Sequence, residues 1–201
     1  MVGLTGGAAT GKTTVARMFK ALGAKVLSAD EIVHKMLRPG ADMWQAVVRE
    51  FGEGILAEGG KLDRRKLAET VFHDPRKRLR LEAITHPPVL DHLSAEAERF
   101  RDTGEGVLIL EIPLLVETSS LGLVDKVLVV TAEQETQIRR LQKRYSIGRE
   151  EAMLRIKSQL PMSEKLRHAD WVVSTEGELC STRKQVERVW STIQKSLTQP
   201  Q

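Results

Sequence analysis

Gly6-Gly7-Ala8-Ala9-Thr10-Gly11-Lys12-Thr13 is the stretch that decides the fold of this 201-residue chain. Two glycines separated by four residues and followed by lysine and threonine are typical of a phosphate-binding loop. Residues 2–5 before the loop suit a short buried strand, and Val15, Met18 and Phe19 after it share one face of a helix. A strand, a glycine-rich loop and a helix in this order present backbone N–H groups and a helix N-terminus to a phosphate.

Several loop residues have separate expected tasks. Lys12 can reach the β- and γ-phosphates of a nucleotide, and the hydroxyl of Thr13 can bind Mg²⁺. The alternative interpretation is a glycine-rich turn before an ordinary amphipathic helix, and the strand–loop–helix context argues against it. The residues predicted to bind ATP are Gly7, Ala8, Ala9, Thr10, Gly11, Lys12, Thr13 and Thr14.

Composition is that of a globular protein of one domain, with 41% hydrophobic and 29% charged residues. The net charge of +4 suits a phosphorylated small substrate as well as a nucleic acid. Aromatic residues make up only 4% of the chain, so a base-stacking surface and a nucleic-acid partner are not expected. Cys180 is the only cysteine, which excludes an internal disulfide and a thiolate metal site.

The expected cellular location depends on the absence of a membrane span and of a signal peptide from the sequence. The apolar run at 107–116 is interrupted by Glu111 and Pro113, so no membrane span is expected. Cleavage of a signal peptide would remove the phosphate loop, so we expect a cytoplasmic protein without a membrane partner.

Alternating strand and helix signals predict an α/β fold around a mostly parallel, five-stranded sheet. Residues 29–103 carry no strand signal, which predicts a helical insertion between two strands. His86-Pro87-Pro88 is expected to break a helix that begins at Pro75. Strands are expected at 2–5, 25–28, 106–110, 126–130 and 171–173. Helices are expected at 12–22, 31–37, 43–51, from 63 through 71, 75–85, 89–101, 133–145, 149–160, near 163–166, and 180–197.

Asp30 follows the second predicted strand directly. Ligands of parallel sheets bind beyond the carboxyl ends of the strands, so a carboxylate here could accept a proton from a substrate hydroxyl during phosphoryl transfer. Asp30 could equally be the N-cap of the helix that follows. Spacing alone leaves both interpretations open.

Other charged residues also have two interpretations each. Arg140, Arg144 and Arg155 lie on two helices joined by a short turn, and they could either stabilise a transferring phosphoryl group or form a solvated basic face. His86 could hold a substrate phosphate or cap a helix end. Glu111 could support a Mg²⁺ site after a core strand or bond to loop backbone.

Several motifs together resemble those of the dephospho-coenzyme A kinase family, a member of the nucleoside-monophosphate-kinase-like group. The resemblance covers nearly the whole chain, and its order of motifs is much more specific than the phosphate loop. The matching elements are Leu4-Thr5-Gly6-Gly7, Ser28-Ala29-Asp30, Leu62-Asp63-Arg64 with Val71-Phe72, Ile84-Thr85-His86-Pro87, Pro113-Leu114-Leu115-Val116-Glu117, Arg140-Leu141 with Arg144, Arg155-Ile156 with Gln159, Lys165, and Ala169-Asp170-Trp171.

The resemblance implies a three-layer P-loop kinase fold that uses ATP and Mg²⁺ to phosphorylate the ribose 3′-hydroxyl of 3′-dephospho-coenzyme A. It implies a nucleotide-binding core at about 1–30, 104–135 and 168–201, a coenzyme A-binding insertion at about 31–103 and a lid at about 136–167. A monomer or weak homo-oligomer is expected. The implied catalytic residues are Asp30, as the base, with Lys12 and Arg140. Arg144 is implied to belong to the ATP site, and Thr13 to bind the metal. The residues implied to bind the acceptor substrate are Asp30, His86, Pro113, Leu114 and Arg155.

Three positions depart from the family pattern. Ser28 stands where the family usually has aspartate, Ala9 where it often has glycine, and Ser174 where it usually has asparagine. Another small-molecule or nucleoside monophosphate kinase on the same scaffold is the main alternative function. A guanine-specific switch would carry an Asn-Lys-x-Asp element, which this sequence lacks, and a DNA-handling ATPase would have a denser basic surface.

Overall fold

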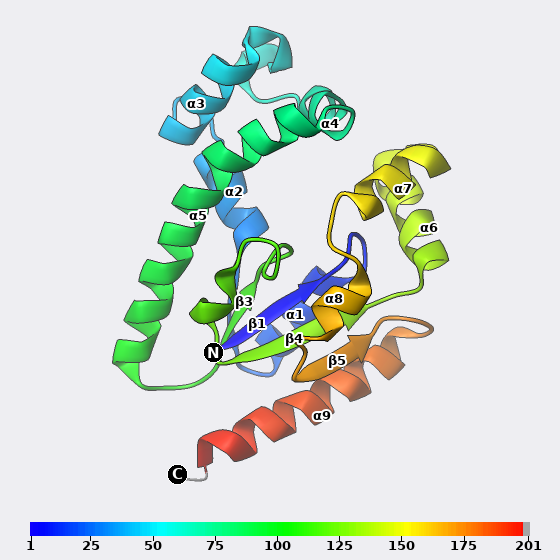
Figure 1. Cartoon of the computed structure of the whole chain (residues 1–201). Helices are drawn as coiled ribbons and strands as arrows, with labels where there is room; N and C mark the ends of the chain where they lie inside the picture. The colour runs from blue at the N-terminus through cyan, green and yellow to red at the C-terminus, as the bar shows by residue number, and fades with distance from the viewer. Residues whose placement is uncertain (199–201) are drawn as a thin grey trace. The chain divides into compact units, whose positions relative to one another are not determined.

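The computed structural model describes residues 1–198 and contains a five-stranded sheet with helices around it (Figure 1). The strand order is β2-β3-β1-β4-β5; β1 pairs in parallel with β3 and β4, and β4 with β5. Each expected strand is present, although the third begins two residues later than predicted and ends at Glu111. The strands are β1 (Val2–Gly6), β2 (Lys25–Ser28), β3 (Leu108–Glu111), β4 (Lys126–Thr131) and β5 (Trp171–Ser174).

The helices follow the expected order, and none within residues 1–198 is long and apolar enough to cross a membrane. The α-helices are α1 (Lys12–Ala21), α2 (Ala29–Met36), α3 (Asp42–Phe51), α4 (Arg64–Phe72), α5 (Pro75–Thr103), α6 (Gln134–Tyr145), α7 (Arg149–Lys157), α8 (Met162–Leu166) and α9 (Leu179–Thr198). Short 3₁₀ helices are η1 (Glu53–Ile55), η2 (Glu58–Gly60) and η3 (Ser120–Leu123).

The chain divides into two compact units, residues 28–96 and the remainder. In the larger unit, β1 is buried along its whole length, as expected of the central strand of a covered parallel sheet. Helices α1 and α9 pack on one face of this sheet, and Phe19 meets Trp190 with ring centroids 6.2 Å apart. Helix α8 packs against β1 and β4.

The smaller unit has its own apolar core, built from helix faces. Val47, Ile55, Leu67 and Val71 are buried in it, with Ile84 packed against them. Asp63 caps α4 as predicted, because its side chain accepts hydrogen bonds from two backbone N–H groups of the first turn. Residues 29–103, all of them described, contain no strand.

The predicted helix break at His86-Pro87-Pro88 is wrong, because α5 continues through it. A proline inside a helix removes an N–H donor and crowds the preceding turn. Here the helix is held by packing on both sides of the prolines: Ile84 contacts the core of the smaller unit, and Val89 and Leu93 are buried. Tertiary packing therefore overrides the local signal.

Candidate active site

The phosphate loop joins β1 to α1 in a tightly wound conformation. Gly6 and Gly11 have φ angles of 151° and 91°, and a Cβ at Gly6 would collide with the carbonyl oxygen of Val130. Ala9 also adopts a left-handed conformation, with φ of 54°. This conformation costs about 1–2 kcal/mol for a residue with a Cβ, so the departure at Ala9 introduces local strain.

Side chains of the loop also hold it in shape. The fully buried hydroxyl of Thr10 donates to the carbonyl of Gly7 at 3.0 Å, so it supports the loop from inside. The ammonium of Lys12 donates to the carbonyls of Gly6 and Gly7 at 3.0 and 2.8 Å. The positive charge of Lys12 therefore already lies at the loop, where the sequence predicts the phosphates.

Thr13 and Glu111 meet at the start of α1. The hydroxyl of Thr13, in the first turn of α1, donates to Oε1 of Glu111 at 2.8 Å. Glu111 is the last residue of β3 and only 3% exposed. Hydroxyl and carboxylate oxygens are the hard ligands that Mg²⁺ prefers, and Mg²⁺ usually combines one or two such groups with water and substrate phosphates. The pair therefore fits a magnesium site beside the phosphate loop.

Arg140 reaches the phosphate loop from α6. Its guanidinium donates to the carbonyl of Ala9 at 3.2 Å, and to both the hydroxyl and the carbonyl of Thr175 at 2.8 Å. The hydroxyl of Thr175 donates in turn to the carbonyl of Thr10 at 2.7 Å. Arg140 thus links α6, the loop after β5 and the phosphate loop, which a solvated basic face would not do.

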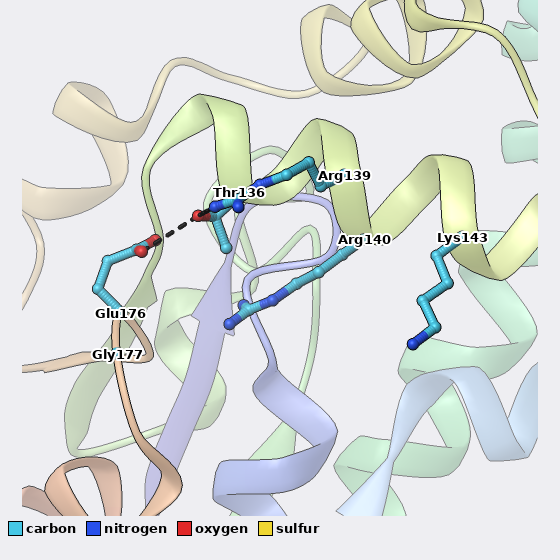
Figure 2. Close-up of a pocket in the computed structure, with 6 residues that line it drawn as sticks. All are labelled: Thr136, Arg139, Arg140, Lys143, Glu176 and Gly177. Atoms are coloured by element: carbon cyan, nitrogen blue, oxygen red, sulfur yellow. Dashed lines mark hydrogen bonds between the residues drawn. The ribbon is translucent and has the colours of Figure 1, made fainter.

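A pocket of about 420 Å³ lies beside Arg140 (Figure 2). Helix α6 supplies basic side chains on one side, and the loop after β5 supplies Glu176, whose carboxylate accepts a hydrogen bond from Thr136 at 3.1 Å. Figure 2 shows Arg140 and Lys143 extending from the same side of α6. The lining residues are Thr136, Arg139, Arg140, Lys143, Glu176 and Gly177.

Asp30 and His86 belong to the smaller unit, and their local settings differ from two of the expectations. Asp30 is not the N-cap of α2, because that helix begins at Ala29 and Ser28 is the N-cap. The carboxylate of Asp30 is in the first turn and exposed, so it is available to a ligand. His86 lies inside α5, so it does not cap a helix end.

The remaining predicted residues lie in the larger unit. The guanidinium groups of Arg144 and Arg155 lie 5.2 and 4.5 Å from the ring centroid of Tyr145, and Arg155 also pairs with Glu151 at 2.7 Å. Pro113 and Leu114 are half-buried in the segment after β3. Thr14 is exposed in the first turn of α1, and Ala8 packs with Ala9 against the apolar cluster of α6 and α7.

Comparison with known proteins decides the family. The sequence model of the dephospho-CoA kinase family matches residues 1–181. The chain belongs to the dephospho-CoA kinase family. It is 40% identical over 196 residues to the dephospho-CoA kinase of Bacillus anthracis, covering 96% of this chain and 98% of that protein.

Solved structures agree with this assignment to the dephospho-CoA kinase family. TT1252 from Thermus thermophilus has a TM-score of 0.76 at 34% identity, covering 98% of this chain and 97% of that one. The dephospho-CoA kinase from Campylobacter jejuni has a TM-score of 0.68 at 29% identity, covering 97% of both chains. These likenesses confirm the predicted α/β P-loop kinase fold and the resemblance on which the kinase prediction depends.

Sequence reasoning missed the residues that support this site. Thr175 binds both Arg140 and the phosphate loop, and its one sequence signal is its place directly after β5. Ser174 is held by Gln185 of α9, whose amide bonds to both its N–H and its carbonyl at 3.0 Å. The loop on this side is therefore fixed through its backbone, with serine in the place where the family usually has asparagine.

Proposed function

We propose that this chain transfers the γ-phosphoryl group of ATP to the ribose 3′-hydroxyl of 3′-dephospho-coenzyme A, giving coenzyme A and ADP. The observation that supports this most strongly is the pairing of a dephospho-CoA kinase sequence over residues 1–181 with a formed phosphate loop bearing Lys12. Another P-loop kinase activity is not favoured by any of these findings.

ATP would bind with its phosphates in the loop formed by residues 7–14. Lys12 would leave the carbonyls of Gly6 and Gly7 for the β- and γ-phosphates, while backbone N–H groups hold the phosphate oxygens. Thr13 and Glu111 would hold Mg²⁺, and a bound Mg²⁺ neutralises charge on the β- and γ-oxygens. Their oxygens already lie 2.8 Å apart, which supports this assignment.

The adenosine part of ATP would lie over the pocket between α6 and the loop after β5. The basic side chains of Arg140 and Lys143 line this pocket and suit the triphosphate that runs from the adenosine to the phosphate loop, and the carboxylate of Glu176 offers a hydrogen-bond acceptor for the neutral adenosine. Arg140 would stabilise the charge that develops during transfer, because arginine donors aimed at equatorial oxygens act most strongly in the transition state. Residues 136–167 would act as a lid that also brings Arg144 and Arg155 to the phosphates.

Asp30 would act as the general base for the acceptor. Its carboxylate would accept the proton of the 3′-hydroxyl as the oxygen attacks the γ-phosphorus. Exposure in the first turn of α2 supports this role, and the N-cap interpretation no longer competes with it. The helical residues 31–103, with His86, would bind the coenzyme A moiety, and Pro113 and Leu114 would contact it from the core.

We further propose that the enzyme works in the cytoplasm as a monomer or weak homo-oligomer, with small molecules as its partners. Its chemistry is tested by offering ATP, Mg²⁺ and equal concentrations of 3′-dephospho-coenzyme A, AMP and shikimate. The proposal expects rapid phosphorylation of 3′-dephospho-coenzyme A alone, lost in Lys12→Ala. Preferential phosphorylation of AMP or shikimate would contradict it.

A further inference from the structure

Lys165 is an unusual lysine, because it is completely buried. It belongs to α8, and its ammonium lies 2.7 Å from Oε1 of Glu117 and donates to the carbonyl of Pro113 at 2.8 Å. Burial lowers the pKa of Lys165, and the hydrogen bond and charge of Glu117 oppose that shift. A buried ammonium is costly unless its partners are well placed, so this arrangement needs a fixed geometry.

Glu117 and Pro113 connect this lysine to two other parts of the larger unit. Oε1 of Glu117 also accepts the backbone N–H of Leu160 at 3.1 Å, in the segment between α7 and α8. The carbonyl of Pro113 also accepts the hydroxyl of Thr5 at 3.0 Å, one residue before Gly6 of the phosphate loop. We call the five residues Thr5, Pro113, Glu117, Leu160 and Lys165 the anchor cluster.

The opposite end of the same helix pair is also held by a glutamate. Glu176 accepts the backbone N–H of Glu133 at 2.6 Å and the hydroxyl of Thr136 at 3.1 Å, where α6 begins. The segment that contains α6 and α7 is thus held at its start by the carboxylate of Glu176 and at its end by that of Glu117. Only the returning end, at Leu160, is tied to a fully buried charge.

We propose that Glu117 and Lys165 are positioning residues that fix the Leu160 end of the α6–α7 pair relative to the phosphate loop. This inference rests on the lid role given to α6 and α7 above. The anchor cluster sets the point about which the returning end of the lid turns. Its loss lets the lid arginines meet the transferring phosphoryl group out of place, and a misplacement of about 1 Å can lower the rate about 10²-fold.

Replacing Lys165 and Glu117 together distinguishes an effect on the stability of the fold from an effect on the position of the lid. Replacing both members of a buried ion pair by apolar residues is often neutral for stability, whereas removing one member leaves an uncompensated charge. The test variant is therefore Lys165→Met with Glu117→Leu. Its matched control is Arg167→Met with Glu164→Leu, which removes an exposed pair of 2.9 Å from the same stretch of chain.

Three measurements are made on both double variants and on the wild type: the melting temperature, the steady-state constants for ATP and 3′-dephospho-coenzyme A, and hydrogen exchange of the Leu160 amide. In the Lys165–Glu117 variant we expect kcat to fall by about 10- to 100-fold, with KM values within about threefold, because misplacement acts on the reacting groups. The Leu160 amide is expected to exchange faster, and the control to match the wild type.

A folded Lys165–Glu117 variant with wild-type kcat, or with unchanged Leu160 exchange, would overturn the proposal. If that variant does not fold, Glu117→Asp replaces it, since it keeps the counter-charge but shortens the reach to Leu160. Glu117→Asp is then expected to lower kcat and to speed hydrogen exchange of the Leu160 amide. A wild-type value for either quantity would likewise contradict the proposal. Failure of the wild-type enzyme to phosphorylate 3′-dephospho-coenzyme A would instead contradict the proposed function, and Leu160 exchange reports on the anchor independently.

Discussion

The hydroxyl of Thr13 and the carboxylate of Glu111 lie 2.8 Å apart, joining the first turn of α1 to the last residue of β3. The two residues are 98 positions apart in sequence, and only the parallel pairing of β1 with β3 brings them together. A buried carboxylate held by one hydroxyl beside the phosphate loop is therefore the feature that most directly suggests a metal.

Glu111→Gln tests the magnesium assignment. The amide keeps an oxygen for the Thr13 hydroxyl but removes the charge that would attract the ion. We expect the Mg²⁺ concentration for half-maximal activity to rise about 10- to 100-fold, the usual cost of losing a supporting carboxylate. Thr13→Ser, which keeps the hydroxyl, serves as the control. An unchanged Mg²⁺ requirement in Glu111→Gln would contradict the assignment of Glu111 to the metal site.

Arg140→Ala distinguishes a catalytic arginine from a structural one. We expect kcat to fall by on the order of 10²-fold or more, with a much smaller change in the Kd for ATP, because the contact strengthens as charge develops. The lost hydrogen bonds to Ala9 and Thr175 also lower stability by about 2 kcal/mol, so assays are made well below the melting temperature.

The neighbouring Arg139→Ala is the matched control for Arg140→Ala. The guanidinium of Arg139 donates to the hydroxyl of Thr136 at 2.8 Å, on its own helix, and the residue is exposed. Arg139 also lines the pocket beside Arg140, so the KM for ATP of this variant is not used as the control readout; its kcat at saturating ATP is expected to stay close to that of the wild type. Equal losses in the two variants would mean that the basic face acts only through its total charge.

Ala9→Gly tests the strain in the phosphate loop. Glycine removes the cost of a left-handed alanine, about 1–2 kcal/mol, against a loss of about 0.5–1 kcal/mol from the greater freedom of the unfolded chain. Urea unfolding is expected to show stability equal to the wild type or up to about 1.5 kcal/mol higher, by the same two estimates. Ala8→Gly, at a residue outside the left-handed region, is expected to lose stability. Equal destabilisation in Ala9→Gly and Ala8→Gly would contradict the claim that Ala9 is strained.

Local signals explain why so much of the fold could be predicted. The phosphate loop, the five strands and the cap at Asp63 each depend on neighbouring residues, and all are present. The break expected at Pro87 and Pro88 is absent, because packing on both sides of the prolines keeps the helix continuous. The local sequence does not contain that packing. Ser28 rather than Asp30 caps α2 because β2 ends one residue before that helix begins.

The candidate site was predictable only in its local parts. Lys12 and Thr13 follow from a contiguous motif, whereas Thr175 contacts Thr10 across 165 positions and Lys165 contacts Pro113 across 52. Such contacts depend on strand order and helix packing. Sequence could mark Lys165 as part of a family pattern, but not as a fully buried charge.

Asp170 supports the pairing of β4 with β5 in a pH-dependent way. Burial would raise its pKa, but hydrogen bonds from Lys126 and the Val127 N–H outweigh burial and lower it from the ordinary value of 3.8. A lowered folded-state pKa means that its contribution is complete above the unfolded-state pKa and is lost as pH falls through the folded-state value.

Asp170→Asn is therefore expected to cost about 1 kcal/mol at pH 7, the upper range for an exposed pair. The difference from the wild type is expected to shrink as pH falls from 3.8, where the carboxylate of the unfolded chain binds a proton, toward the lower pKa of the folded state. Urea unfolding of both proteins from pH 7 to pH 3 measures it. A stability difference that stays constant, or grows, at low pH would contradict the sign of this pKa shift.

The turnover of Asp30→Asn, measured at saturating ATP and 3′-dephospho-coenzyme A alongside a melting curve, tests the central claim most directly. Asn cannot accept the proton, so kcat is expected to fall on the order of 10²–10⁴-fold. Asp30 is exposed and does not cap α2, so the melting temperature is expected to stay nearly unchanged. Near-normal turnover by the folded variant would contradict the assignment of Asp30 as the base that receives the proton of the 3′-hydroxyl.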